Sequence, residues 1–175
     1  MEIWKEFEAN ELTHSAAHHL LAIYEVGLGY GGWARVSDIA RQLDITRGSV
    51  SINLRTLKKR GLIETDDHHM VKLSAKGRQV AQAVMAKRVV VKAFFADVLG
   101  APEVQADIDS CKIEHLISDA TGQRLVRFVR YLMSDDPVAR ECLARFRGVH
   151  GECPDSRACE VCKGHCLLDE LERAI

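Results

Sequence analysis

The sequence contains no apolar run long enough to cross a membrane. A transmembrane helix needs about 20 consecutive apolar residues, and no such stretch occurs among the 175 residues. Residues 1–6 also lack the basic and apolar regions of a signal peptide. We therefore expect a cytoplasmic protein without a membrane partner. In that compartment cysteines are thiols or metal ligands more often than disulfides.

The chain also has little net charge and lacks common catalytic motifs. The formal charge is only −1, and the chain has neither a nucleophile elbow nor a glycine-rich phosphate loop, so we expect it not to be an enzyme. The small net charge hides an uneven distribution. Residues 34–80 carry ten Lys and Arg against five Asp and Glu, whereas residues 1–33 carry one against five and residues 101–175 ten against fourteen. A basic segment between acidic ones is typical of a surface that faces phosphates.

The basic segment has the pattern of a helix–turn–helix. Residues 34–43 place their apolar side chains on one helical face, and Ser37 is the expected N-cap. A polar turn over residues 44–48 separates this helix from a second one at residues 49–60, where apolar residues again recur at helical spacing. Gly61 is a suitable residue to end the second helix.

The residues that follow indicate a wing. Segments 62–65 and 70–73 are short and enclose a polar tip, as the strands of a hairpin do. We therefore predict a winged helix–turn–helix that binds a double-stranded DNA operator, because short polar and basic side chains on the second helix can bond base edges and phosphates. The alternative is a small helical domain whose basic face is only solvated. The expected DNA-binding residues are Thr46, Arg47, Ser49, Ser51, Asn53, Arg55, Lys58 and Lys59.

Helices are expected through the rest of the chain. Those within residues 74–133 are too apolar to be solvated spacers, so they form a core or a dimer interface. Cys142 is expected to be buried on the last helix. The expected helices run from Leu12 to about Gly27, from Ser74 to Leu99, from Pro102 to about Ile117, from Thr121 to Met133, and from Asp135 to near Gly148.

The predicted fold class is mainly α and has three parts. They are a winged helix–turn–helix DNA-binding domain at residues 1–76, an all-helical dimerisation and metal-sensing domain at residues 77–135, and a C-terminal helix with a short Cys-rich metal-binding tail at residues 136–175.

Residues 111–115, Cys-Lys-Ile-Glu-His, combine three metal-binding side chains. Cys111, Glu114 and His115 lie at positions i, i+3 and i+4, which share one face of a helix. A thiolate, a carboxylate and an imidazole suit a divalent transition metal, and the sulfur disfavours Mg²⁺ and Ca²⁺. Taken alone, the pattern more often means a cysteine that faces the core beside a surface Glu-His pair.

Residues 36–40, 74–77 and 111–119, in this order and spacing, resemble the diphtheria-toxin-repressor family of metal-dependent transcriptional regulators. The resemblance covers residues 12–133. It implies a winged-helix domain, a helical dimerisation domain, and repression by a homodimer when Fe²⁺ or Mn²⁺ is bound. It also implies a regulatory metal site for Fe²⁺, or for Mn²⁺, Co²⁺ or Zn²⁺. The implied ligands are His18, Cys111, Glu114 and His115.

This chain departs from the family pattern in several places. The family usually has Met or Asp where this chain has His18. Its ancillary metal site takes a His and a Glu from the long helix, and the matching residues here are Arg88 and Lys92, which cannot bind a cation. These two can instead neutralise carboxylates such as Asp107 and hold the same helices together without metal. The SH3-like third domain of longer members has no counterpart in the sequence.

Four cysteines lie within fourteen residues of the tail, in the spacing Cys-x5-Cys-x2-Cys-x3-Cys among loop-forming residues. Such a group suits a metal centre better than a core. Both a compact Zn²⁺ site and a [4Fe–4S] cluster fit, and we favour the cluster. His165 lies inside the loop and can replace one cysteine. The predicted ligands are Cys153, Cys159, Cys162 and Cys166.

Together these features predict a repressor of metal-uptake genes. The regulatory metal would join the first helix to the dimerisation domain and hold two recognition helices about one DNA turn, roughly 34 Å, apart. Without it, the cost of ordering the domains would weaken DNA binding. Two alternatives remain open. One is a redox or nitrosative-stress regulator that senses only through the tail cluster, and the other is a protein-interaction module whose tail is stapled by zinc.

Overall fold

The computed structural model describes residues 12–149 of the chain. Two compact units, Met1–Tyr131 and Leu132–Ile175, divide the chain. No helix of the described part is long and apolar enough to span a bilayer. The elements in order are α2 (His14–Leu28), β1 (Trp33–Ala34), α3 (Val36–Gln42), α4 (Arg47–Lys59), β2 (Ile63–Thr65), β3 (Val71–Leu73), α5 (Ala75–Ala93), the π-helical segment η1 (Phe94–Val98), α6 (Glu103–Ile113), α7 (Asp119–Leu132) and α8 (Pro137–Arg147).

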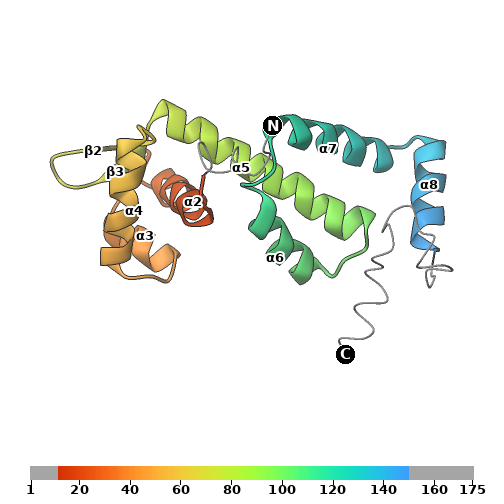
Figure 1. Cartoon of the computed structure of the whole chain (residues 1–175), viewed down its shortest axis with the longest axis horizontal. Coiled ribbons are helices and arrows are strands. Elements are labelled where there is room, and N and C mark those ends of the chain that lie inside the picture. Colours follow the sequence, from red (N-terminus) through yellow and green to blue (C-terminus); the bar gives the residue numbers. More distant parts are fainter. Residues whose placement is uncertain (1–11, 150–175) are drawn as a thin grey trace, which may run out of the picture. The chain divides into compact units, whose positions relative to one another are not determined.

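The predicted mainly α fold with a winged helix–turn–helix is confirmed. Its core lies where α2, α3, α4 and the small sheet meet (Figure 1). Leu20 of α2, Ile39 of α3 and Leu57 of α4 are each fully buried there. Burial of such side chains stabilises the fold by about 1.5–3 kcal/mol each. Because α2 contacts both helices of the motif, it belongs structurally to the winged-helix domain.

The sheet has three antiparallel strands in the order β1-β3-β2. Pairing of Ile63 with Leu73 and of Thr65 with Val71 confirms the predicted wing. The sequence analysis missed β1, in which Trp33 pairs with Lys72, because two residues are too few to show an alternating pattern. The Lys72 ammonium lies 4.7 Å from the centre of the Trp33 ring, which ties this added strand to the wing.

Two predicted helix starts are wrong. Ser37 lies inside α3, and Arg35 occupies the cap position without a side-chain hydrogen bond. The predicted turn also ends early, because Thr46 is the N-cap of α4 and its Oγ1 accepts a hydrogen bond from the Ser49 backbone N–H at 3.2 Å. The backbone of Thr46 is extended, so its hydroxyl can satisfy a backbone donor that would otherwise be free. The helix therefore begins at Arg47 and includes Gly48, which was predicted to lie in the turn.

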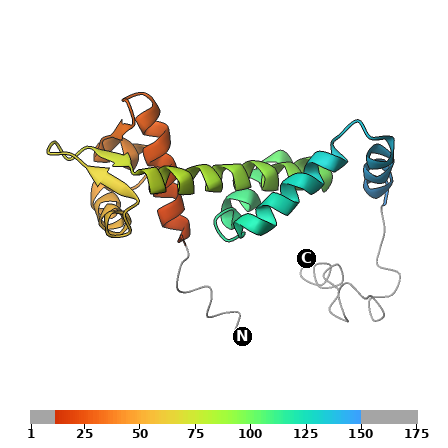
Figure 2. The same cartoon turned by 90° about the horizontal axis from the view of Figure 1, so that it is seen from above.

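The end of the motif and the start of α5 agree with the sequence. Gly61 has φ +68°, a conformation that glycine adopts without steric cost. Ser74 caps α5, and its Oγ accepts from the Gly77 N–H at 3.0 Å. Figure 2 shows α5 running as one long helix from the wing to the part of the unit that carries α6 and α7.

A later helix boundary and the burial of one cysteine also differ from the predictions. The helix predicted to reach Ile117 ends four residues earlier, with Glu114 at its C-cap. Ser118 accepts a hydrogen bond from the Thr121 N–H, so the intervening residues form a turn into α7 instead of continuing α6. In the second unit, Cys142 is exposed, not buried as expected. The reason is that α8 buries only Ala139.

Candidate metal centre and recognition helix

The second helix of the motif, α4, separates apolar and polar side chains onto different faces. Val50, Leu54 and Leu57 are buried against the core. Among the predicted DNA-binding residues, Ser51 and Asn53 are half-buried. The exposed ones are Thr46, Arg47, Ser49, Arg55, Lys58 and Lys59.

Several of these polar groups have partners inside the domain. Asn53 Oδ1 accepts a hydrogen bond from Ser15 Oγ of α2 at 3.1 Å, and Asn53 Nδ2 donates to the Ser49 carbonyl. Lys58 Nζ donates to Thr65 Oγ1 at 2.6 Å. These contacts give Asn53 and Lys58 a role in holding α4 against α2 and the wing. The Arg47 guanidinium, by contrast, is exposed at the start of α4 and faces solvent.

Ile52 is a residue of α4 that the sequence analysis missed. Its side chain is 63% exposed, although most of its neighbours on this surface are polar. The signal in the sequence was its position outside the buried stripe. On a helix that enters the major groove, such a side chain is suited to contact the methyl group of a thymine.

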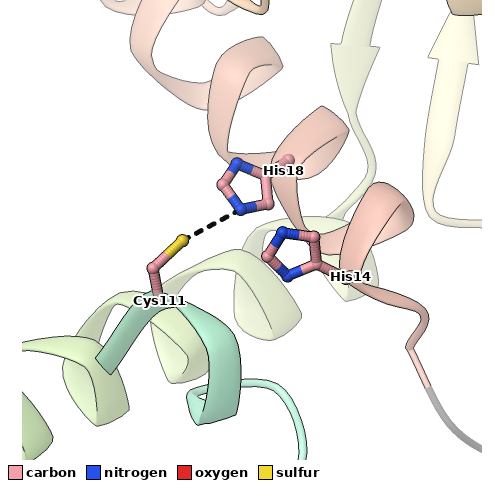
Figure 3. A group of neighbouring side chains, drawn as sticks. All are labelled: His14, His18 and Cys111. Atoms are coloured by element: carbon pink, nitrogen blue, oxygen red, sulfur yellow. Dashed lines mark hydrogen bonds between the residues drawn. The ribbon is translucent and has the colours of Figure 1, made fainter. Parts of the chain in front are cut away.

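Three metal-binding donor atoms lie close together between α2 and α6. His14 and His18 come from α2, Cys111 comes from α6, and the three side chains point toward one another (Figure 3). Their donor atoms all lie within 4.8 Å of one another, and Cys111 Sγ is 3.2 Å from His18 Nε2. The sequence analysis missed His14, although its spacing of four residues from His18 predicts that the two imidazoles share a face.

The other two predicted ligands lie near this group but are not members of it. Glu114 is fully buried, and its Oε2 lies 3.8 Å from Arg88 Nε. Burial raises the pKa of Glu114 to about 7 although the Arg88 charge opposes the shift. The His115 ring centre is 5.1 Å from that of His14. The structure therefore brings His18 and Cys111 together as predicted and adds His14.

The donor chemistry fits a divalent transition metal. Burial, followed by the charge of His14, lowers the pKa of His18, which keeps a lone pair available on its ring. Burial, followed by the charge of Glu114, raises the pKa of the Cys111 thiol. A thiol in such surroundings becomes a thiolate readily only beside a cation, which a metal ion would provide.

Ion pairs occupy the place where the family pattern has an ancillary metal site, as predicted. Arg88 Nη2 lies 3.2 Å from Asp107 Oδ1, and Lys92 Nζ lies 3.6 Å from Asp107 Oδ2 and 3.4 Å from Glu103 Oε1. These contacts join α5 to α6 through the protein's own cations. All three pairs are partly exposed, so each contributes modestly to stability.

Comparison with known proteins follows the same division of the chain. Residues 74–154 match the family model described as "Iron dependent repressor, metal binding and dimerisation domain", and residues 11–69 match the MarR family model. The chain is 30% identical over 118 residues to the iron-dependent repressor IdeR of Mycobacterium tuberculosis, which covers 67% of this chain and 51% of that protein. It belongs to the diphtheria-toxin-repressor-like family.

Other proteins that are similar to this chain support the same assignment. Over 89 residues the chain is 32% identical to the diphtheria toxin repressor of Corynebacterium jeikeium, covering 51% of this chain and 37% of that one. The crystal structure of T. acidophilum IdeR matches with a TM-score of 0.54 at 24% identity, over 67% of this chain and 54% of that one. The manganese regulator SloR matches with a TM-score of 0.58 at 23% identity, over 66% and 53%. These structures show the shared fold.

The likeness covers part of each relative. The chain spans about half the length of the iron-dependent repressors that it matches. The predicted tail ligands Cys153, Cys159, Cys162 and Cys166 lie outside the described residues.

Proposed function

We propose that this family member is a metal-dependent transcriptional repressor that binds operator DNA as a homodimer and takes Fe²⁺ at its regulatory site. One observation carries the proposal. Cys111 Sγ and His18 Nε2 lie 3.2 Å apart although 93 residues separate them in the chain. This pair joins α2, which packs against the recognition helix, to α6, which packs against α5.

The position of the pair suggests how a metal signal reaches the DNA. When bound, a divalent ion supplies a cross-link between α2 and α6. His18 and Cys111 then hold the winged-helix domain in one orientation relative to α5, and the recognition helices of a dimer keep a spacing of about 34 Å. Without the link, part of the binding free energy is spent on ordering the domains. Glu114 and His115 complete the proposed ligand set, with Mn²⁺, Co²⁺ and Zn²⁺ as other possible ions.

An apolar groove supports the homodimer. Residues of α5 and α7 line it, including Met85, Val126 and Val129. At its edge, Val89 is 70% exposed. An apolar surface of this kind suits a second copy of the chain. The groove lies within residues 74–154, which match a family model described as a metal binding and dimerisation domain.

DNA selection tests the proposed function. The Co²⁺-loaded chain, kept without oxygen, would be used to select duplexes from a random-sequence pool. We expect a selected duplex to bind at least about tenfold more tightly with Co²⁺ or Fe²⁺ than with a chelator, since allosteric couplings are typically about 5–150-fold. Affinity should fall steeply with salt. Failure to select any duplex, or a salt-independent interaction, would favour the zinc-stapled protein-interaction module.

Replacing Arg47 with alanine should weaken binding to the selected duplex about 5- to 100-fold, because one base or phosphate contact of the recognition helix is lost. Fluorescence anisotropy with labelled duplex would measure the affinity, and sedimentation would check that the dimer persists. Arg145→Ala is the matched control, since Arg145 is an exposed arginine of α8 paired with Glu141. Equal losses in both variants would argue against α4 as the reader.

We also propose that Cys153, Cys159, Cys162 and Cys166 together hold one [4Fe–4S] cluster or one Zn²⁺. Four thiolates in a short loop repel one another without a cation. Anaerobically purified protein should be brown, contain acid-labile sulfide and bleach in air if it holds a cluster, or be colourless with about one Zn²⁺ per chain. Four freely reactive thiols in metal-free protein would contradict both forms. If serine at these four positions abolished regulation while the His18 site still bound metal, the redox regulator would be the better reading.

A further inference from the structure

The first turn of α2 presents a second imidazole to the proposed regulatory site. His14 and His18 are one helical turn apart, and their ring centres are 4.3 Å apart. Both rings are directed toward Cys111 (Figure 3). His14 is exposed, whereas His18 and Cys111 are half-buried, so the group opens to solvent on the His14 side and an ion can enter there.

The spacing of the three donors is close to what a small cation requires. A tetrahedral ion with metal–nitrogen bonds of about 2.0 Å and metal–sulfur bonds of about 2.3 Å holds its donors roughly 3.3–3.6 Å apart. Cys111 Sγ and His18 Nε2 are already 3.2 Å apart, and every donor pair lies within 4.8 Å. The difference between this limit of 4.8 Å and the spacing around such an ion is about 1 Å, and the exposed His14 side chain has room to move by that amount.

The composition of this group differs from that of a site built mainly on carboxylates. Two imidazoles and a thiolate are borderline and soft donors. Such donors bind late transition ions more tightly than they bind Mn²⁺. The nearby carboxylate of Glu114 lies 3.8 Å from the Arg88 guanidinium, which partly neutralises it. With this carboxylate partly neutralised, the imidazole nitrogens and the Cys111 sulfur determine which ion the site binds most tightly.

We propose that His14 is a metal ligand of this chain, and that with His18 and Cys111 it makes the regulatory site favour Zn²⁺, Co²⁺ and Fe²⁺ over Mn²⁺. The inference rests on the proposed function, because it assigns a further ligand to the same site. His14 thereby sets metal selectivity from the winged-helix side of the cross-link. An aspartate at this position would present a hard oxygen donor to the same ion.

The test measures metal affinity in the full chain with serine at the four tail cysteines, which removes their contribution. Competition titrations with Zn²⁺, Co²⁺ and Mn²⁺, and the thiolate-to-cobalt charge-transfer band, would be recorded for His14→Ala and His14→Asp. We expect His14→Ala to weaken Co²⁺ and Zn²⁺ binding at least about tenfold and Mn²⁺ binding much less. We expect His14→Asp to recover Mn²⁺ affinity preferentially. His68→Ala, which removes an exposed histidine of the wing, is the matched control.

The outcomes separate this inference from the proposed function. Affinities within twofold of the parent for every ion in His14→Ala, together with loss of Co²⁺ binding in Cys111→Ser, would overturn the role of His14 and leave the regulatory site in place. No Co²⁺ binding by the parent, or no effect of Cys111→Ser, would overturn both. Folding can be checked by circular dichroism. Aspartate in the first turn of a helix is favourable, so His14→Asp remains informative if His14→Ala proves unstable.

Discussion

His18→Ala should remove the metal dependence of DNA binding and leave the metal-free affinity unchanged. His18 is the donor of α2 that lies 3.2 Å from Cys111 Sγ of α6. Without it α2 offers the ion only the exposed His14, and this single donor does not fix the two helices relative to each other. We expect binding to the selected duplex with Co²⁺ to fall by about 5- to 150-fold, which is the usual range of an allosteric coupling. Anisotropy titrations with Co²⁺ and with chelator would measure both affinities.

The metal-free affinity is an internal control. The His18 side chain is remote in sequence from α4, and the core residues that hold α4 are unchanged. A variant that binds more weakly than the metal-free parent under both conditions would therefore have lost its fold and not its signal. His18→Asp restores a ligand and should regain part of the metal response. Full metal activation in His18→Ala would contradict the cross-link between α2 and α6.

Gly77→Ala should destabilise the protein by about 3 kcal/mol or more, the range of severe backbone overpacking. A Cβ at this position would lie 1.8 Å from the Leu62 carbonyl oxygen. That carbonyl also accepts a hydrogen bond from the Ser74 N–H, so the start of α5 and the end of the recognition motif would have to separate. Urea unfolding followed by circular dichroism would measure the loss, at several concentrations because a dimer's stability depends on concentration.

Gly29→Ala is the matched control. Gly29 has φ −81°, and the nearest heavy atom to an added Cβ is the Val26 carbonyl oxygen at 4.0 Å. We expect a change in unfolding free energy within about 1 kcal/mol, in the stabilising direction, since alanine restricts the unfolded chain. Equal destabilisation by both substitutions would show that the close approach of Gly77 to Leu62 is not the cause.

These two glycines show why helix propensity alone misleads here. Inside a helix, replacing glycine with alanine stabilises by about 1 kcal/mol, and on this basis the sequence predicts a gain at Gly77. The contact with Leu62 reverses the sign. Such a contact joins two segments that are fifteen residues apart, and no local pattern records it.

The local features were predictable because they depend on neighbours in sequence. The buried stripe of Val50, Leu54 and Leu57 follows from helical periodicity, and Gly61 and Ser74 mark helix ends by their own backbone preferences. Local competition also explains the errors. Thr46 is the N-cap of α4, so that helix begins earlier than predicted. Ser118 accepts a hydrogen bond from the first turn of α7, so α6 ends earlier than predicted.

The same distinction between local and tertiary features applies to the metal site. The sequence by itself determined that Cys111 is followed by Glu114 and His115 in a spacing suited to a metal, and that Arg88 and Lys92 cannot be ligands. Only the tertiary structure decided which donors converge. It brought His14 to Cys111 and placed Glu114 beside Arg88. The physical reason is that donor geometry depends on how α2, α5 and α6 pack, and that packing is set by buried contacts between residues far apart in the chain.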